Sequence, residues 1–261
     1  MNVRLRLTTF AAPMRFYALA GAVIPWCWAV AILTGLAALV IGLGIAPTDF
    51  QQKDAYRIIF IHVPAAWMSM VLYLAIAFWA GLGWILRVRM AALLARAIAP
   101  TGALFTFVAL LTGALWGQPT WGTWWVWDAR LTSELILLFL YLGYMALVEA
   151  IDDPRRASEA GALLALVGAV NVPVIYFSVR WWNTLHQGST ISMTTAPKMA
   201  HTMLLALLLA TIACWAYAFA VAFTRARALV LEHEKDARWV GELAAPANPK
   251  SPDPLTPSAS S

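Results

Sequence analysis

Apolar residues occur along this chain in six long runs that are separated by short polar segments. The runs cover approximately residues 26–46, 63–86, 98–116, 133–151, 161–179 and 200–223. A helix needs roughly 20 apolar residues to cross a bilayer, and each run is close to that length. The alternating ten-residue segments of a membrane β-barrel do not occur in this sequence. The pattern therefore predicts an all-α polytopic membrane protein, a bundle of six transmembrane helices.

The composition agrees with a membrane protein and excludes a soluble globular domain. Of the 261 residues, 62% are hydrophobic and 12% are charged, and the mean hydropathy is +0.72. The first apolar run is longer than the roughly 7–15 residues of a secretory signal core, so we expect it to be retained as a span. Cys27 and Cys214 lie in different spans without Cys-x-x-Cys spacing, and we expect them to serve packing.

Basic residues are distributed unequally between the two sides of the predicted bundle. Thirteen of the 18 Lys and Arg residues fall on the side that holds both termini, and five fall on the other side. Because basic loops stay in the cytoplasm, we expect both termini to be cytoplasmic in a bacterial inner membrane. The other loops then face the periplasm. This asymmetry largely accounts for the net charge of +5, and no nucleic-acid partner is needed to explain it.

We expect two units along the chain. Residues 1–245 form a six-span membrane domain, which includes a tryptophan-rich segment at residues 116–133. Residues 246–261 are rich in Pro and Ser, and this composition predicts a disordered cytoplasmic tail.

The start of the fourth span carries charged and hydroxyl side chains. Arg130 and Glu134 are four residues apart, so they can pair on one helix face. Thr132 or Ser133 can cap the helix. Glu134 then lies about one turn inside the membrane, where a carboxylate is costly unless it has a partner or borders a wet cavity.

Two further patterns concern the packing of the spans. Asn171 and Pro173 predict a kink in the fifth span. This kink serves either helix packing alone or the opening of a cavity toward the outer face. Gly113 and Gly117 have G-x-x-x-G spacing in the third span, which indicates close packing against another helix.

The tryptophan-rich segment contains five tryptophans in twelve residues. If it were helical, three of them would form one aromatic face with Asp128 one turn further on: Trp121, Trp124 and Trp125. Pro119 and Gly122 instead favour a short, partly helical amphipathic segment at the outer membrane surface. Such a segment suits a large, flat, apolar ligand with a polar edge. An ordinary belt of interfacial tryptophans is the open alternative.

Histidines from two other loops lie on the same predicted side. His62 comes just ahead of the second span, which has Pro64 in its first turn. His186 follows Trp181 and Trp182 after the fifth span. His201 opens the last span without an aromatic neighbour, so we favour an interfacial role for it. Each histidine alone is also consistent with a capping or interfacial residue.

Together, the two imidazoles and the tryptophans of residues 116–133 favour a haem site. Haem iron takes one or two imidazole ligands, and the flat porphyrin packs well against tryptophan. Its propionates need donors at the wet edge, where five side chains could serve: Arg57, Arg130, Thr132, Arg180 and Asn183. No Cys-x-x-Cys-His motif occurs, so the haem would be held without a covalent bond.

The run Trp-Gly-Thr-Trp-Trp-Val-Trp-Asp-Ala-Arg-Leu-Thr-Ser at residues 121–133 resembles the tryptophan-rich, or WWD, signature of the haem-handling membrane protein family. The His-Val-Pro-Ala-Ala run at His62 and the Trp-Trp-Asn-Thr-Leu-His-Gln-Gly run at residues 181–188 are similar to those of its small, six-span members. The resemblance extends from the first span to the last. It implies haem delivery during cytochrome c maturation, with haem b bound transiently at the periplasmic face.

The resemblance also implies roles for particular residues and partners. His62 and His186 match the two outer histidines that are proposed as axial ligands of the iron. The signature residues that hold haem and contact the acceptor are Trp121, Gly122, Trp124, Trp125, Trp127, Asp128 and Arg130. We add Trp181, Trp182 and Asn183 as haem contacts. The implied partners are a periplasmic haem chaperone, the ATPase and membrane subunits of an ABC transporter, and a small single-span membrane subunit.

Two other functions stay open at this point. The first is a membrane enzyme of the haem lyase type, which would be expected to have more spans and a large outer domain. The second is a non-haem transporter or assembly subunit whose aromatic loop only contacts a partner. The chain has no G-x-x-x-x-G-K-[ST] motif, so it does not bind ATP through a P-loop, and we expect a binding and transfer protein rather than an enzyme.

Overall fold

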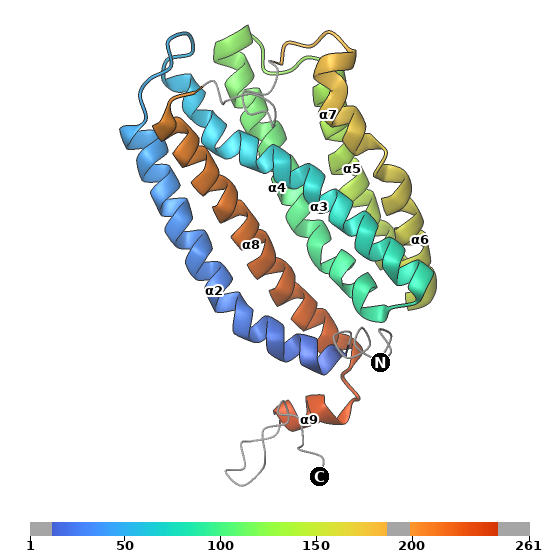
Figure 1. Cartoon of the computed structure of the whole chain (residues 1–261). Helices are drawn as coiled ribbons and strands as arrows, with labels where there is room; N and C mark the ends of the chain where they lie inside the picture. The colour runs from blue at the N-terminus through green and yellow to red at the C-terminus, as the bar shows by residue number, and fades with distance from the viewer. Residues whose placement is uncertain (1–11, 187–198, 245–261) are drawn as a thin grey trace, which may run out of the picture.

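Figure 1 shows the computed structural model of the chain, which describes residues 12–186 and 199–244. Within these residues, six helical segments are long and apolar enough to cross a membrane. They are Pro13–Ile45, Asp54–Leu86, Arg89–Trp121, Ala129–Ala150, Pro154–Trp181 and His201–His233. The predicted all-α polytopic fold with six spans is therefore confirmed. Several segments extend beyond the apolar runs, because each helix continues into the polar residues at the membrane surface.

The individual helices subdivide these spans. In chain order they are α2 (Pro13–Leu39), η1 (Val40–Ile45), η2 (Asp54–Ile58), α3 (Ile59–Leu86), α4 (Arg89–Trp121), α5 (Ala129–Ala150), α6 (Pro154–Gly168), α7 (Asn171–Trp181), α8 (His201–His233) and the short α9 (Arg238–Ala244). The predicted tail at 246–261 lies outside the described residues.

The helices form two groups around a central pair. α2 packs along α8 on one side, α3 packs along α4 in the centre, and α5, α6 and α7 lie on the other side (Figure 1). At one end of the bundle, which we call the loop end, residues 46–53, 122–128 and 182–186 come together. The Lys and Arg residues that the sequence assigned to the periplasmic side and that the structure describes are Lys53, Arg57, Arg130 and Arg180. All four lie toward this end.

Individual residues determine where α4 ends and where α5 begins at the loop end. α4 continues through Pro119 and stops at Gly122, whose φ of 75° is a left-handed conformation that glycine adopts at little cost. Asp128 caps α5, because its Oδ1 accepts a hydrogen bond of 2.8 Å from the Leu131 N–H. The expected cap at Thr132 or Ser133 is therefore wrong. Ser133 lies inside the helix and donates its hydroxyl hydrogen to the Ala129 carbonyl.

The predicted kink of the fifth span is present between α6 and α7. Asn171 begins α7 and its Nδ2 donates a hydrogen bond of 2.8 Å to the Ser133 carbonyl of α5. This bond ties α7 to α5 at membrane depth, where an unpartnered amide would be costly. The kink thereby fixes the direction in which α7 carries the chain to the loop end.

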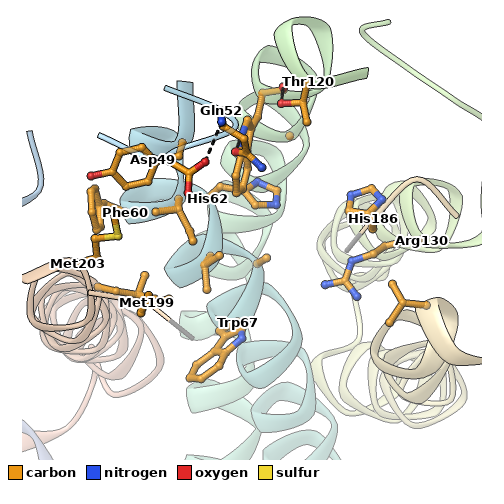
Figure 2. Close-up of a pocket in the computed structure, with 18 of the residues that line it drawn as sticks. Asp49, Gln52, Phe60, His62, Trp67, Thr120, Arg130, His186, Met199 and Met203 are labelled. Carbon is orange, nitrogen blue, oxygen red and sulfur yellow. Dashed lines mark hydrogen bonds between the residues drawn. The ribbon is translucent and has the colours of Figure 1, made fainter. Parts of the chain in front are cut away.

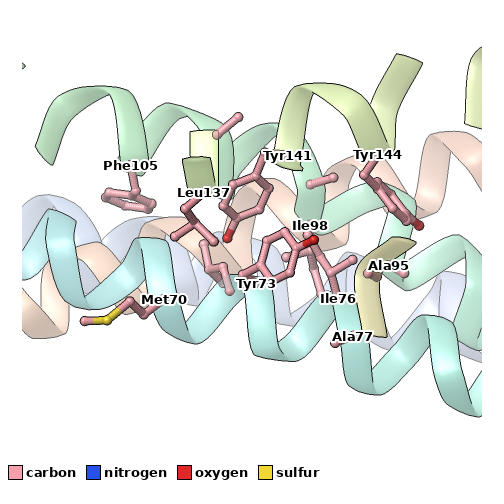
Figure 3. Close-up of a cluster of buried hydrophobic side chains, with 14 of the residues drawn as sticks. Met70, Tyr73, Ile76, Ala77, Ala95, Ile98, Phe105, Leu137, Tyr141 and Tyr144 are labelled. Carbon is pink, nitrogen blue, oxygen red and sulfur yellow. The ribbon is translucent and has the colours of Figure 1, made fainter. Parts of the chain in front are cut away.

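A buried aromatic core holds α3, α4, α5 and α6 together beneath the loop end (Figure 3). The rings of Tyr73 and Tyr141 pack edge to face with centroids 5.0 Å apart. The Tyr141 hydroxyl donates a hydrogen bond of 2.6 Å to the Ser69 carbonyl. Gly102 leaves room for this ring, since a Cβ there would lie 2.2 Å from Tyr141. Because interiors pack at crystal-like density, this core holds the middle parts of α3, α4 and α5 in fixed positions.

Candidate functional site

A cavity of about 730 Å³ lies at the loop end, between α3, α4, α5, α7 and α8. Its volume is within the range of small-molecule and cofactor sites. The polar and aromatic lining includes His62, Trp116, Trp121, Arg130, Arg180 and His186. The apolar lining includes Phe60, Val63, Trp67, Met70, Met203 and Leu207. Figure 2 shows His62 on one wall and His186 with Arg130 on the opposite wall, with open space between them.

His62 is held by two partners on α4. Its Nδ1 lies 3.0 Å from the Ala109 carbonyl oxygen and 3.1 Å from the Thr112 hydroxyl. A carbonyl only accepts, and the Thr112 hydrogen is donated to the Val108 carbonyl, so Nδ1 must carry the hydrogen. In the neutral imidazole the lone pair is then on Nε2. The sequence placed His62 just ahead of a helix, whereas α3 begins at Ile59 and includes His62 in its first turn.

His186 comes from the segment after α7 and contacts the tryptophan-rich segment. Its Nδ1 lies 3.5 Å from Asp128 Oδ2 and 3.3 Å from the Thr184 hydroxyl. Its ring packs edge-on against Trp121, with centroids 4.9 Å apart. The carboxylate favours the tautomer with the hydrogen on Nδ1. In both His62 and His186, the Nε2 atom has no hydrogen-bond partner among the described residues.

The charges around His186 favour its neutral form. Burial, and then the positive charge of Arg130, lower the pKa of His186 from its ordinary 6.5, against the attraction of Asp128. The pKa of Asp128 is also lowered. Burial acts to raise it, but the contacts with the Thr184 hydroxyl, the Leu131 N–H and His186 together outweigh burial. At neutral pH the site therefore presents an uncharged imidazole beside a carboxylate.

This electrostatic arrangement predicts the titration of His186 in the empty protein. We expect its imidazole to gain a proton only at a pH below 6.5, because the folded chain disfavours the charged form. The measurement is an NMR pH titration of histidine-labelled protein in detergent. The His186 resonance is assigned from its loss in His186→Gln, which is practical in a chain with four histidines. A midpoint above 6.5 would contradict this prediction.

The structure separates the predicted site residues by their positions. Five of them line the cavity: His62, Trp121, Arg130, Arg180 and His186. Asp128 lies behind His186, and Gly122 forms the turn that ends α4. The other tryptophans and Asn183 do not line the cavity. Trp125 is half-buried with its ring against Trp127, whereas Trp124, Trp127, Trp181, Trp182 and Asn183 are exposed.

The tryptophan-rich segment is only partly helical, as the sequence favoured, because α4 ends at Trp121 and the next residues are irregular. Two expectations about neighbouring residues are wrong. Arg57 is not directed to the cavity, since its guanidinium donates to the Gly42 and Ala46 carbonyls. Arg130 and Glu134 form no salt bridge in the described part of the chain. The Arg130 guanidinium instead donates to the Ile175 carbonyl at 3.3 Å.

Sequence reasoning missed residues that support His62. Gly113 faces the imidazole, and a Cβ at this position would lie 3.1 Å from His62 Cε1. The Trp116 ring packs edge-on against His62, and its Nε1 donates a hydrogen bond of 2.9 Å to Gln52. The G-x-x-x-G spacing of Gly113 and Gly117 is a signal for these contacts, although by itself it indicates only helix packing. A Cβ at Gly117 would lie 3.1 Å from the Thr123 carbonyl oxygen and 3.2 Å from the Trp121 ring.

The fold and the cavity define a polytopic α-helical membrane protein with two opposed histidines in a tryptophan-lined cavity at one end of the bundle. Residues 6–241 match the family described as "Heme exporter protein C". The chain belongs to this family.

Individual relatives agree with the family match. The Heme exporter protein C of Escherichia coli (strain K12) is 46% identical over 243 residues, which cover 91% of this chain and 96% of the relative. That of Bradyrhizobium diazoefficiens is 50% identical over 212 residues, 79% of this chain and 78% of the relative. A Marchantia polymorpha protein named "Putative cytochrome c biosynthesis ccmC-like mitochondrial protein" is 46% identical over 169 residues, 65% of this chain and 70% of the relative.

Proposed function

We propose that this chain binds haem without a covalent bond in the two-histidine cavity and delivers it for cytochrome c maturation. The observation that carries the proposal is the pair of opposed imidazoles, each with its Nδ1 turned to a protein acceptor and its Nε2 left as the coordinating atom. The names of the relatives support haem as the cargo and cytochrome c biosynthesis as the process.

The side chains around the two histidines fit haem. Metal-bound imidazoles commonly donate their second N–H to a carbonyl or a carboxylate, as His62 and His186 are placed to do. Asp128 Oδ2 is buried without a hydrogen-bond partner in the described part of the chain, so it can accept from His186 when iron orients the ring. Gly113 leaves room for the His62 ring. Arg130 and Arg180 line the same cavity and can bind propionates.

We further propose that the loop end faces the periplasm of a bacterial inner membrane and that both termini are cytoplasmic. The unequal distribution of Lys and Arg supports this orientation. Trp124 and Trp127 are 58% and 77% exposed beside the cavity, so we assign them to contact with a periplasmic haem chaperone rather than with the porphyrin. ABC transporter subunits and a small single-span subunit are the further proposed partners, and this chain acts as a binding and transfer protein rather than an enzyme.

The test is a titration of the purified full-length protein with ferric haem in mild detergent. We expect a low-spin absorption spectrum typical of bis-imidazole haem. The double variant His62→Ala/His186→Ala should lose this spectrum, because both nitrogen ligands are removed. His201→Ala is the matched control, since His201 is exposed and does not line the cavity. An unchanged spectrum in the double variant would rule out these two histidines as the ligands.

A further inference from the structure

A second, small cavity connects a buried glutamate to the space between the two histidines. It measures about 30 Å³, which is enough for about two water molecules. Its lining includes His62, Arg130, Glu134 and His186, and His62, Arg130 and His186 also line the large cavity. Glu134 is therefore a carboxyl group at the membrane-side base of the proposed haem site. The proposed function gives it no role.

The surroundings of Glu134 compensate its charge only in part, through the nearby positive charge of Arg130 and one hydroxyl group. The side chain is buried on α5, with the residue 7% exposed, and Oε1 accepts a hydrogen bond of 2.7 Å from the Ser69 hydroxyl. Among the described residues it forms no salt bridge, although Arg130 lies one turn away on the same helix. A buried carboxylate in a membrane protein is costly without an opposite charge. A positively charged group that enters the adjacent space is therefore stabilised.

Ferric haem brings such a charge to this place. Iron(III) in the dianionic porphyrin with two neutral imidazoles leaves one net positive charge at the metal centre, whereas iron(II) leaves none. We propose that the Glu134 carboxylate is the counter-charge of ferric iron and makes the site prefer ferric over ferrous haem. This inference rests on the proposed haem site. Glu134 acts as a positioning residue through space, because neither ring of the two histidines is bonded to it.

The first experiment measures the midpoint potential of haem in the full-length protein by spectroelectrochemical titration. Glu134→Gln keeps the size of the side chain and an acceptor for Ser69 but removes the charge. We expect the ratio of ferric to ferrous affinity to fall about tenfold, which raises the midpoint potential by about 59 mV for one electron. The control is Glu149→Gln on the same helix, whose side chain is 84% exposed and lies 3.7 Å from Arg96, and it should leave the potential unchanged.

A second porphyrin ligand distinguishes the effect of the Glu134 charge from an effect of Glu134 on the shape of the site. Zinc protoporphyrin has the same ring with a neutral metal centre. Glu134→Gln should weaken ferric haem binding about tenfold and change zinc protoporphyrin binding less than about twofold. An equal loss for both porphyrins would mean that Glu134 only supports the shape of the site, and it would overturn the inference.

Ser69→Ala provides a variant that retains the glutamate. It removes the hydroxyl that stabilises the carboxylate, so we expect a smaller rise of the potential in the same direction. A wild-type protein that fails to bind haem through two imidazoles would contradict the proposed function. A wild-type protein that binds haem in this way, with the same potential in Glu134→Gln and Ser69→Ala, would contradict only the role of Glu134.

Discussion

Replacing His62 by glycine should weaken ferric haem binding about tenfold more than replacing His186 by glycine. His62 lies on a helix, and its Nδ1 has two acceptors at 3.0 and 3.1 Å. Its ring also packs against Trp116. His186 lies in an irregular segment with polar contacts of 3.3 and 3.5 Å. A ligand that is already oriented loses less freedom when it binds iron, so His62 contributes more to affinity.

The measurement is the affinity of ferric haem for the two single variants, together with their spectra. We expect His186→Gly to retain haem on His62 with one axial position open, and added imidazole to restore the low-spin spectrum. His62→Gly should hold haem weakly, because it loses the ligand whose Nδ1 is oriented by the Ala109 carbonyl and the Thr112 hydroxyl. Equal losses, or a greater loss in His186→Gly, would show that the contacts of His62 do not preorganise it.

If the proposed function holds, this difference predicts an order of events in haem transfer. An acceptor that supplies its own ligand would displace His186 first, while His62 still holds the iron. The exposed Trp124 and Trp127 lie in the same segment that ends at Asp128, the partner of His186. An acceptor that contacts these tryptophans would therefore bind close to His186, the ligand that is held less firmly.

The membrane fold could be predicted from the sequence because its signal is local. The length of each apolar run is sufficient to identify a span, and Asn171 with Pro173 was sufficient to place the break between α6 and α7. The helix ends were less predictable. α4 passes Pro119 because a proline removes only one backbone donor near the end of a helix, where neighbouring residues can adjust.

The candidate site was predictable only in part, because it depends on contacts between distant segments. The sequence identified His62 and His186 by their place on one side of the membrane, and their role as ligands stays a prediction. It could not show that the Ala109 carbonyl, 47 residues away, accepts from His62. Nor could it separate Trp121, which lines the cavity, from Trp124 and Trp127, because the left-handed turn at Gly122 redirects the chain between them.

Asp128→Asn should weaken haem binding by about tenfold or more while leaving the fold intact. Asp128 has two roles that one substitution can separate. Oδ1 caps α5 through the Leu131 N–H, and Oδ2 faces His186 Nδ1. Asparagine is as good an N-cap as aspartate, so the cap is kept, but the negative charge beside the imidazole is lost. The imidazole then becomes a weaker donor to iron, because a hydrogen-bonded carboxylate raises the basicity of the ligand.

The matched control is Asp153→Asn, in which the same residue type caps α6 through the Arg156 N–H at 2.7 Å, away from the cavity. Haem affinity and thermal stability are measured for both variants in the same detergent. We expect both to retain stability to within about 0.5 kcal/mol, and only Asp128→Asn to lose haem affinity. Asp128→Ala should lose affinity to a similar degree and also about 1 kcal/mol of stability, because the cap is removed as well. If Asp128→Asn bound haem as tightly as Asp153→Asn, the carboxylate would serve only the helix, and His186 would be oriented by Thr184 and Trp121 alone.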